Sequence, residues 1–307
     1  MEPLVDPFGR PVTSLRVSVT QRCNLDCFFC HREGEHAPGT EMTPSEIGTL
    51  IDVASGLGVV KLKVTGGEPL MRGDIVEVIR AASPWVREVS MTTNGILLPS
   101  VAKELRAAGL RRVNISLHSL RRESVKQIAG VDCLDQVKAG IEAAREADLT
   151  PIKLNFVAMR GLNSEEVPDM LRLSAETGAI LQLIEYQPLE RGRERWGDLY
   201  YDVNPLERQW EREAVRIVEQ EMHLRRRYTL PSGATVEVVR PIHNTVFCAN
   251  CNRLRLTSDG RLKPCLMRGD NLVPAVQLIR GGATRREIED AFREATSLRE
   301  PYWRGAG

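Results

Sequence analysis

Two groups of three cysteines lie near opposite ends of this sequence, and their spacing is typical of metal binding. The first group is Cys23, Cys27 and Cys30, and the second is Cys248, Cys251 and Cys265. A four-iron cluster normally takes four thiolates. A site with three thiolates therefore leaves one iron open to a ligand that is not protein. The pattern predicts two iron–sulfur clusters, each able to bind a small molecule.

Zinc is the alternative metal at each group, because zinc favours four ligands drawn from cysteine and histidine. In the first group His31 directly follows Cys30, which is a cramped arrangement for one tetrahedral ion, so a larger cluster is favoured. The second group resembles a zinc ribbon that lacks one partner. His223 or His243 could complete it, so its spacing alone leaves both metals open.

A glycine-rich segment and several basic residues indicate what the open irons would meet. Residues 66–69 read Gly-Gly-Glu-Pro, which marks an ordinary turn or a backbone cradle whose carbonyls approach a cationic amine. Arg253 and Arg255 alternate along an expected strand and so project from one face. Arginine forks match phosphate oxygens. With Arg16, Lys63 and Lys153 at inward-looking strand positions, they predict a polyphosphate site, although each could instead lie on a solvated face.

Composition excludes several classes of function. The chain has 307 residues with 42 basic and 41 acidic side chains, so no global field favours a nucleic acid or a membrane. Two basic runs, 225–227 and 121–122, are expected to be solvated surfaces. No secretory segment or long apolar stretch is found, and we expect a cytoplasmic protein. In that reducing compartment seven cysteines favour metal chemistry over disulfides. Cys133, outside both groups, is expected to be a packed side chain.

The elements that position these residues alternate between short apolar runs and segments of helical periodicity. Strands are predicted over residues 15–20, 60–65, 88–93, 112–117, 152–158 and 180–186, with helices near 44–57, 74–83, 99–108, 134–147 and 164–177. Six such units predict an α/β fold, an incomplete (β/α)6 barrel of the TIM type, with a doubly wound sheet as the alternative. Catalytic groups of such barrels follow the C-terminal ends of the strands. The first cysteines, residues 66–69, residues 92–95 and Ser116 all occupy such places.

The regular alternation of predicted strands and helices ends at about residue 188. A loop is predicted over 189–204, a helix near 205–222, and a hairpin of residues 223–230 with 235–240 that turns at 231–233. A second hairpin turning at 258–260 follows, then helices near 271–279 and 284–295. We therefore divide the chain into a partial barrel, residues 1–187, and a C-terminal α+β extension, residues 188–307, that closes the barrel opening.

These motifs together resemble a known family. The first cysteine group, with Thr65 and residues 66–69, resembles the radical S-adenosylmethionine (SAM) enzymes. The second group with Arg253 and Arg255 resembles, among them, the GTP 3',8-cyclase family of molybdenum cofactor biosynthesis. The resemblance runs from about Phe8 to Cys265. It implies two [4Fe-4S] clusters, the first binding SAM and the second the guanine of GTP.

The resemblance also implies a function and site residues. The reaction would be the cyclisation of GTP to (8S)-3',8-cyclo-7,8-dihydroguanosine 5'-triphosphate, after cleavage of SAM to methionine and a 5'-deoxyadenosyl radical that abstracts the ribose 3' hydrogen. No protein side chain would carry out this chemistry. The SAM contacts would be Phe29, Gly67, Ser116 and Gln187, and the GTP contacts Arg16, Lys63, Thr92, Lys153, Arg253, Leu254 and Arg255.

The sequence departs from the family at three places. Lys63 stands where many relatives carry arginine, so the charge survives without the bidentate fork. Gln187 stands where many relatives carry methionine. The chain ends Gly305-Ala306-Gly307, whereas relatives often end in Gly-Gly with a tail that reaches into the site.

The expected partners are GTP, an electron donor of the flavodoxin or ferredoxin type, and cyclic pyranopterin monophosphate synthase as the next enzyme. A homodimer is left open. Two other functions remain as alternatives: a radical SAM enzyme that modifies a peptide and carries an auxiliary cluster, and a non-catalytic zinc-binding adaptor. Peptide-modifying enzymes tend to have more downstream cysteines, and only Cys133 is spare here.

Overall fold

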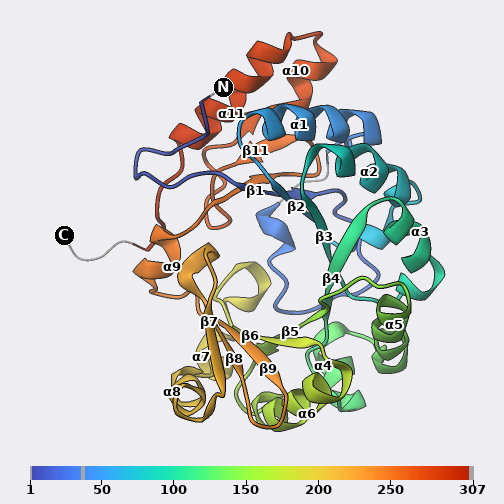
Figure 1. The fold of residues 1–307 in the computed structure, drawn as a ribbon, viewed down its shortest axis with the longest axis vertical. Coiled ribbons are helices and arrows are strands. Elements are labelled where there is room, and N and C mark those ends of the chain that lie inside the picture. Colours follow the sequence, from blue (N-terminus) through green and yellow to red (C-terminus); the bar gives the residue numbers. More distant parts are fainter. Residues whose placement is uncertain (1, 36–38, 304–307) are drawn as a thin grey trace.

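The computed structural model describes residues 2–35 and 39–303, and within them it contains the six predicted β/α units (Figure 1). The C-terminal residues 305–307 lie outside the described part of the chain. The six strands are β1 (Ser14–Ser18), β2 (Lys61–Thr65), β3 (Glu88–Thr93), β4 (Leu110–Ser116), β5 (Lys153–Ala158) and β6 (Ile180–Glu185). The predicted helices are α1 (Pro44–Gly56), α2 (Ile75–Ala82), α3 (Ala102–Ala107), α5 (Leu134–Glu146) and α6 (Val167–Thr177).

Local sequence explains where several helices begin and end. Helix α1 starts at a capping box in which Thr43 and Glu46 satisfy each other's backbone amides. One further helix, α4 (Arg122–Ala129), was not predicted. Its signal was present, because Val125, Ile128 and Ala129 are buried at helical spacing and Gly130 ends the helix in a left-handed conformation.

The C-terminal part adds strands to both edges of the same sheet. The strand order is β12-β11-β10-β1-β2-β3-β4-β5-β6-β9-β8-β7. Strand β10 (Arg253–Leu256) pairs parallel with β1, and β9 (Thr235–Val239) pairs parallel with β6. Antiparallel strands follow outward on each side: β11 (Arg261–Lys263), β12 (Val273–Pro274), β8 (Arg226–Thr229) and β7 (Arg216–Glu219). The sheet curls but does not close, as an incomplete barrel requires.

Short elements of the extension span the opening between the two ends of the sheet. Figure 1 shows α9 (Thr245–Ala249) between them. The backbone amide of His223 donates to the carbonyl of Asn250 (2.9 Å), which joins the β7–β8 connection to the segment that follows α9. The extension therefore covers the barrel opening, as expected.

Predictions for the extension were right for its hairpins and less accurate for its helices. Both hairpins form. The helix expected over 205–222 ends early, as α8 (Asn204–Glu213), because Ile217 and Val218 enter strand β7 and pair with β8. The expected loop 189–204 contains the short helix α7 (Trp196–Leu199). The last helices are α10 (Val276–Arg280), which begins later than expected, and α11 (Arg285–Ser297).

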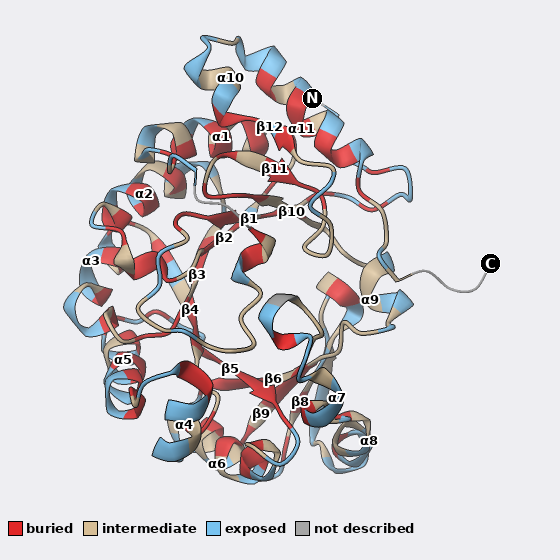
Figure 2. Cartoon of the chain, turned by 180° about the vertical axis from the view of Figure 1, so that it is seen from behind, coloured by how far each residue is buried: buried red, intermediate tan, exposed pale blue. Residues whose placement is uncertain are grey.

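The parallel strands present an apolar outer face and a polar inner face. Side chains at alternate strand positions, such as Leu15, Leu62 and Leu154, are fully buried beneath the surrounding helices. Figure 2 shows that the helices also turn their buried sides toward the sheet. The residues between them face the barrel interior and are charged or polar. Arg16 and Lys63 are examples. The core therefore lies outside the barrel, between sheet and helices, and the interior is left free for a ligand.

Helix α5 lies very close to the loop after β3. A Cβ atom on Gly140 would lie 2.2 Å from the carbonyl oxygen of Gly95, a distance that no side chain allows. This contact supports the loop that carries Asn94 at the mouth of the barrel.

We predict that Gly140→Ala lowers the free energy of unfolding by about 1–3 kcal/mol, because two backbone segments must move apart. Gly197→Ala is the matched control, since nothing lies within 4 Å of its would-be Cβ and the position is helical. Urea denaturation of both variants measures the difference. Equal stability of the two variants would contradict the tight packing of α5.

Candidate functional site

All six cysteines of the two groups line one cavity of about 860 Å³ inside the barrel. The first group lies in the loop after β1. The second lies in and after α9 and after β11. Sequence positions more than two hundred residues apart therefore meet in one space. The convergence follows from the direct pairing of β10 with β1.

Backbone contacts with the glycine segment fix the loop of the first group. The amide of Gly67 donates to the carbonyl of Thr20 (2.7 Å), and the amide of Glu68 donates to that of Arg22 (2.8 Å). A Cβ atom on Gly67 would lie 2.4 Å from the carbonyl oxygen of Arg22. Only glycine permits this approach. The segment therefore supports the cysteine loop, whichever ligand it also meets.

Glu68 ties the loops after β2 and β3 together. Its buried carboxylate accepts hydrogen bonds from Thr93 Oγ1 (2.7 Å) and from the amides of Asn94 (2.6 Å) and Leu70 (3.0 Å). Burial raises the pKa of Glu68 above its ordinary value. Asn94 in turn donates to Asn24 in the cysteine loop (2.7 Å). Loops from three strands are thus joined at the first group.

The thiols of the first group are held in a partly buried setting. Burial raises the pKa of Cys27 to about 12 and also raises the pKa of Cys23 and of Cys30. Only a cation, such as a metal, would keep such thiols deprotonated. Three cysteine thiols at one mouth of a cavity are a donor set that fits an iron–sulfur cluster with one open iron.

The three histidines considered as zinc ligands, His31, His223 and His243, each make another contact in the structure. Within residues 2–35 and 39–303, no three His, Cys, Asp or Glu side chains are grouped around one ion position. His31 accepts a hydrogen bond from the amide of Glu33 at Nδ1 (3.0 Å). His223 stacks on Phe247 with ring centroids 3.6 Å apart, and His243 packs on Trp303 at 4.1 Å.

Two buried arginines, which sequence reasoning missed, hold the loop of the second group. Arg10 donates to the carbonyl of Cys248 (2.8 Å), and Arg299 donates to the carbonyl of Cys251. Both arginines pair with Asp6, at 2.7 and 3.2 Å. Arg299 is only 1% exposed. A short motif cannot reveal this support, because it joins the two ends of the chain.

These arginines also set the charge around the second group. Burial opposes ionisation of Cys251, but Arg253, Arg299 and Arg10 outweigh it, so the pKa of this thiol falls below its ordinary value. Cys251 therefore lies in an electropositive setting that favours its thiolate, whereas burial raises the pKa of Cys248 in the same group.

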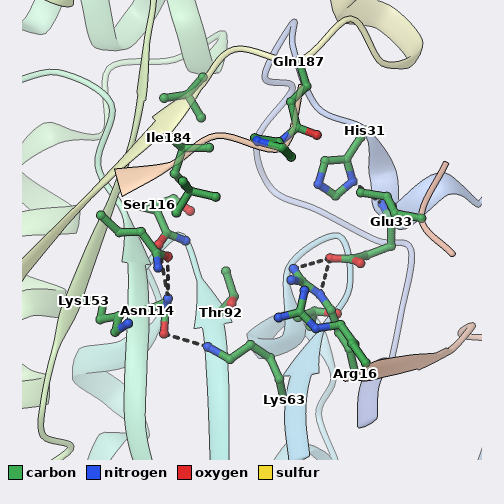
Figure 3. A pocket seen from close by; sticks show the side chains of 18 of the residues that line it. Arg16, His31, Glu33, Lys63, Thr92, Asn114, Ser116, Lys153, Ile184 and Gln187 are labelled. Atoms are coloured by element: carbon green, nitrogen blue, oxygen red, sulfur yellow. Dashed lines mark hydrogen bonds and ion pairs between the residues drawn. The ribbon is translucent and has the colours of Figure 1, made fainter. Parts of the chain in front are cut away.

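Cations lie side by side on the inner face of the sheet. Register places Arg255 opposite Arg16, and Arg16 opposite Lys63, on three neighbouring strands. The carboxylate of Glu33 accepts from Arg16 (2.6 Å) and Arg255 (2.7 Å), the former visible in Figure 3. Burial would raise the pKa of Glu33, but the two guanidinium groups dominate and lower it to about 2. Lys63 donates to Asn114 Oδ1 (2.7 Å), and burial drives its pKa well down.

A second group of cations surrounds Glu237. Its fully buried carboxylate accepts from Lys153 (2.6 Å), Arg225 (2.8 Å) and Arg227 (3.1 Å). The prediction that residues 225–227 form a solvated surface is therefore wrong for two of the three. Arg225 and Arg227 line the cavity, because side chains alternate along extended backbone, and Arg226 alone points outward to pair with Glu211. The run 121–122 is exposed, as expected.

The remaining predicted contacts fall into two sets. Those that line the cavity are Phe29, Gly67, Thr92, Ser116, Gln187 and Arg253. Leu254 does not line the cavity. It lies between Arg253 and Arg255 in the sequence, so its side chain projects from the other face of β10, where it is fully buried. Cys133 is 5% exposed, as its predicted packing role requires. His118, not predicted, packs edge-on against Phe29 at 4.9 Å between ring centroids.

Sequence comparisons agree with this geometry. The model of the radical SAM superfamily matches residues 17–174, and that of Molybdenum Cofactor Synthesis C matches residues 179–304. A Pyrococcus abyssi protein named "Probable GTP 3',8-cyclase" is 50% identical over 98% of this chain and 99% of its own length. A protein of the same name from Thermococcus kodakarensis is also 50% identical, over 98% and 100%. The chain belongs to the GTP 3',8-cyclase family of radical SAM enzymes.

Membership in the radical SAM superfamily brings SAM and an iron–sulfur cluster as cofactors. The crystal structure of Streptococcus suis SuiB bound to S-adenosylmethionine matches with a TM-score of 0.66 at 17% identity, covering 92% of this chain and 68% of that one. At this identity the likeness shows the shared fold alone. None of the helices in the described residues has the length and apolarity that crossing a membrane requires.

We predict that the thiols of the cluster-free enzyme differ in reactivity. At about pH 8, Cys251 should be alkylated by iodoacetamide faster than Cys27, because only thiolates react and the pKa of Cys27 is about 12. Raising the pH should accelerate the alkylation of Cys27 more than that of Cys251. Peptide mass spectrometry measures both rates. Arg299→Met should slow the alkylation of Cys251 and leave the alkylation rate of Cys27 unchanged. If Cys27 reacts faster than Cys251 in the unmodified sequence, the charge assignment is contradicted.

Proposed function

We propose that this chain is an enzyme that cyclises GTP to (8S)-3',8-cyclo-7,8-dihydroguanosine 5'-triphosphate, the first step of molybdenum cofactor biosynthesis. The observation that carries the proposal is that both cysteine groups line one cavity together with a set of basic side chains. The names of the relatives that are 50% identical support it. A cavity lined by two groups of three thiols suits two cofactor-bound ligands that must react with each other.

The end of the cavity near the first cysteine group would hold SAM. When bound, an iron–sulfur cluster and SAM supply methionine and a 5'-deoxyadenosyl radical. The protein provides the surroundings. The Gly66–Gly67 backbone lies against the cysteine loop. Phe29 of that loop lines the same cavity, as do Ser116 at the end of β4 and Gln187 after β6. Gln187, in place of methionine, offers amide hydrogen bonds.

The basic wall would hold the triphosphate. Arg16, Lys63, Lys153, Arg253 and Arg255 all line it, and Thr92 adds a hydroxyl. Lys63 and Arg253 have no carboxylate within ion-pair distance among the described residues, so an anionic ligand could supply the counter-charge that would favour their charged forms. We propose that Leu254 takes part only through its backbone and helps to set the spacing of its neighbours.

The second cysteine group would hold a second [4Fe-4S] cluster whose open iron anchors the guanine. The protein contributes orientation: with the base held near Cys248 and the phosphates held by the wall, the ribose would lie toward the first group. Positioning of this kind lowers the entropic cost of reaction. The covered opening would also keep water away from a reactive radical.

Other parts of the proposal concern the surroundings of the enzyme. We propose that it acts in the cytoplasm, that a flavodoxin or ferredoxin supplies electrons, and that cyclic pyranopterin monophosphate synthase takes the product. A homodimer and the division into residues 1–187 and 188–307 are also proposed. Whether the C-terminal residues 305–307 reach into the site, as the tail of many relatives does, concerns residues outside the described part of the chain.

Anaerobic incubation with reductant, SAM and GTP tests the function. We expect 5'-deoxyadenosine and a cyclised nucleotide triphosphate in equal amounts by mass spectrometry, and roughly eight irons per chain for two four-iron clusters. A modified peptide substrate with unchanged GTP would favour the peptide-modifying alternative. Zinc in place of iron, without SAM cleavage, would favour the adaptor.

We predict that Cys251→Ser separates the two ends of the cavity. The variant should still cleave SAM, because the first group is intact, but should lose most cyclisation of GTP and about half of its iron. Iron analysis and product mass measure both effects. Cys133→Ala is the matched control and should retain full iron and activity. Unchanged cyclisation in a Cys251→Ser protein shown to lack the second cluster would contradict the proposal.

A further inference from the structure

The loop of residues 31–35 places a carboxylate where a phosphate would be expected. Glu33 is 8% exposed, and both its oxygens are used: one accepts from Nε and Nη2 of Arg16 (3.1 and 2.6 Å), the other from Nη1 of Arg255 (2.7 Å). These are two of the arginines that the proposed function gives to the triphosphate. Figure 3 shows the carboxylate of Glu33 directed toward the guanidinium group of Arg16.

The cations of the wall need an anion even when no substrate is bound. Arg255, Arg16 and Lys63 are direct neighbours across three parallel strands. Like charges directly opposite one another on a sheet are destabilising, and burial strengthens the repulsion. Glu33 offsets the charge of the two arginines in the ligand-free cavity. Fork-like pairing is the same chemistry by which arginine binds phosphate.

The backbone that carries Glu33 is strained. Arg32, Glu33 and Gly34 adopt φ angles of 45°, 53° and 67°, and the first two are non-glycine residues in the left-handed region. Such conformations persist only where surrounding contacts hold them. Here the contacts include the two ion pairs, the bond of the Glu33 amide to His31, and a hydrogen bond from Lys263 to the carbonyl of Gly34 (3.0 Å). The amide of Gly34 also donates to the carbonyl of His31 (2.7 Å), and Glu35 accepts from the amide of Ser258 (3.0 Å). Loss of the ion pairs would remove the contacts that hold the Glu33 side chain itself.

Glu237, the other carboxylate among the phosphate-binding cations, is built differently. It lies within the regular strand β9 and is fully buried. Three cations and Gln182 contact it. Moving it would disrupt the sheet. Glu237 is therefore a fixed counter-charge, whereas Glu33 belongs to a short loop outside the sheet, with two non-glycine residues in the left-handed region.

We infer that Glu33 is an internal stand-in for the substrate's phosphates, which holds Arg16 and Arg255 in place in the empty cavity and yields them to a polyphosphate ligand. The inference rests on the proposed function. Because the loop begins directly after Cys30, arrival of the triphosphate would change the backbone beside the first cysteine group. Substrate binding at one end of the cavity would then be felt at the other.

The test compares affinity for inorganic triphosphate, measured by calorimetry on the anaerobically reconstituted enzyme. Glu33→Gln keeps the shape but removes the competing charge, and should lower the dissociation constant roughly tenfold, the effect of one charged contact. Glu88→Gln is the matched control. Glu88 also lines the cavity and pairs with an arginine, Arg112 (2.6 Å), but lies on strand β3. Loss of the Glu88 charge should change the affinity for triphosphate less than twofold.

Hydrogen exchange of the amides of residues 31–35 gives a second readout. Triphosphate should speed exchange in the wild-type loop, and Glu33→Gln should show fast exchange without ligand. If that variant folds poorly, Glu33→Asp, too short to reach both arginines, should show the same changes at smaller size. Unchanged or weaker binding in the variants, or an equal gain in Glu88→Gln, would overturn the inference. Failure of the wild-type enzyme to bind triphosphate would overturn the proposed polyphosphate site itself.

Discussion

Like charges gathered inside a barrel are the constraint on which this structure depends. Helices cover the outer face of the sheet, so the apolar core lies there and the inner face is free to be polar. Arg16, Lys63 and Arg255 are then adjacent across the strands. A buried charge is costly unless it is paired. The buried carboxylates of Glu33 and Glu237 meet this requirement in part by pairing with these and neighbouring cations, and a polyanionic ligand would complement the remaining charge.

The two cysteine groups are positioned by different means. The first group is held mainly by backbone contacts. Gly67 allows the loop after β2 to approach the cysteine loop closely, and Glu68 accepts a hydrogen bond from the amide of Asn94 in the loop after β3. The second group is held by side chains. Arg10, near the N-terminus, and Arg299, near the C-terminus, donate hydrogen bonds to the backbone carbonyls of Cys248 and Cys251. Burial raises the pKa of all three thiols in the first group, whereas arginines lower the pKa of Cys251 in the second. The two groups therefore differ in their electrostatic surroundings although their residue types are alike.

Much of the fold followed from local sequence, because the six β/α units carry strong periodicity and their strand ends carry the motifs. Long-range pairing did not. Nothing local shows that β10 lies beside β1, that Asp6 joins Arg299, or that Glu237 lies beneath Lys153. Arg225 and Arg227 alternate like Arg253 and Arg255, yet a run of three arginines looks like a surface when the burial of its strand is unknown. Leu254 was expected in the site because the family resemblance covers the whole segment 253–255, but its side chain is buried away from the cavity.

The pairing of β1 with β10 has a consequence for how the protein is made. Strand β1 is complete after residue 18, but the partner on one of its edges arrives only with residues 253–256. During synthesis the ribosome must deliver more than four-fifths of the chain before that edge is covered. Until then, one edge of β1 has no partner, and an unpaired edge can associate with other chains. The sheet on that side of the barrel can therefore be completed only late in synthesis.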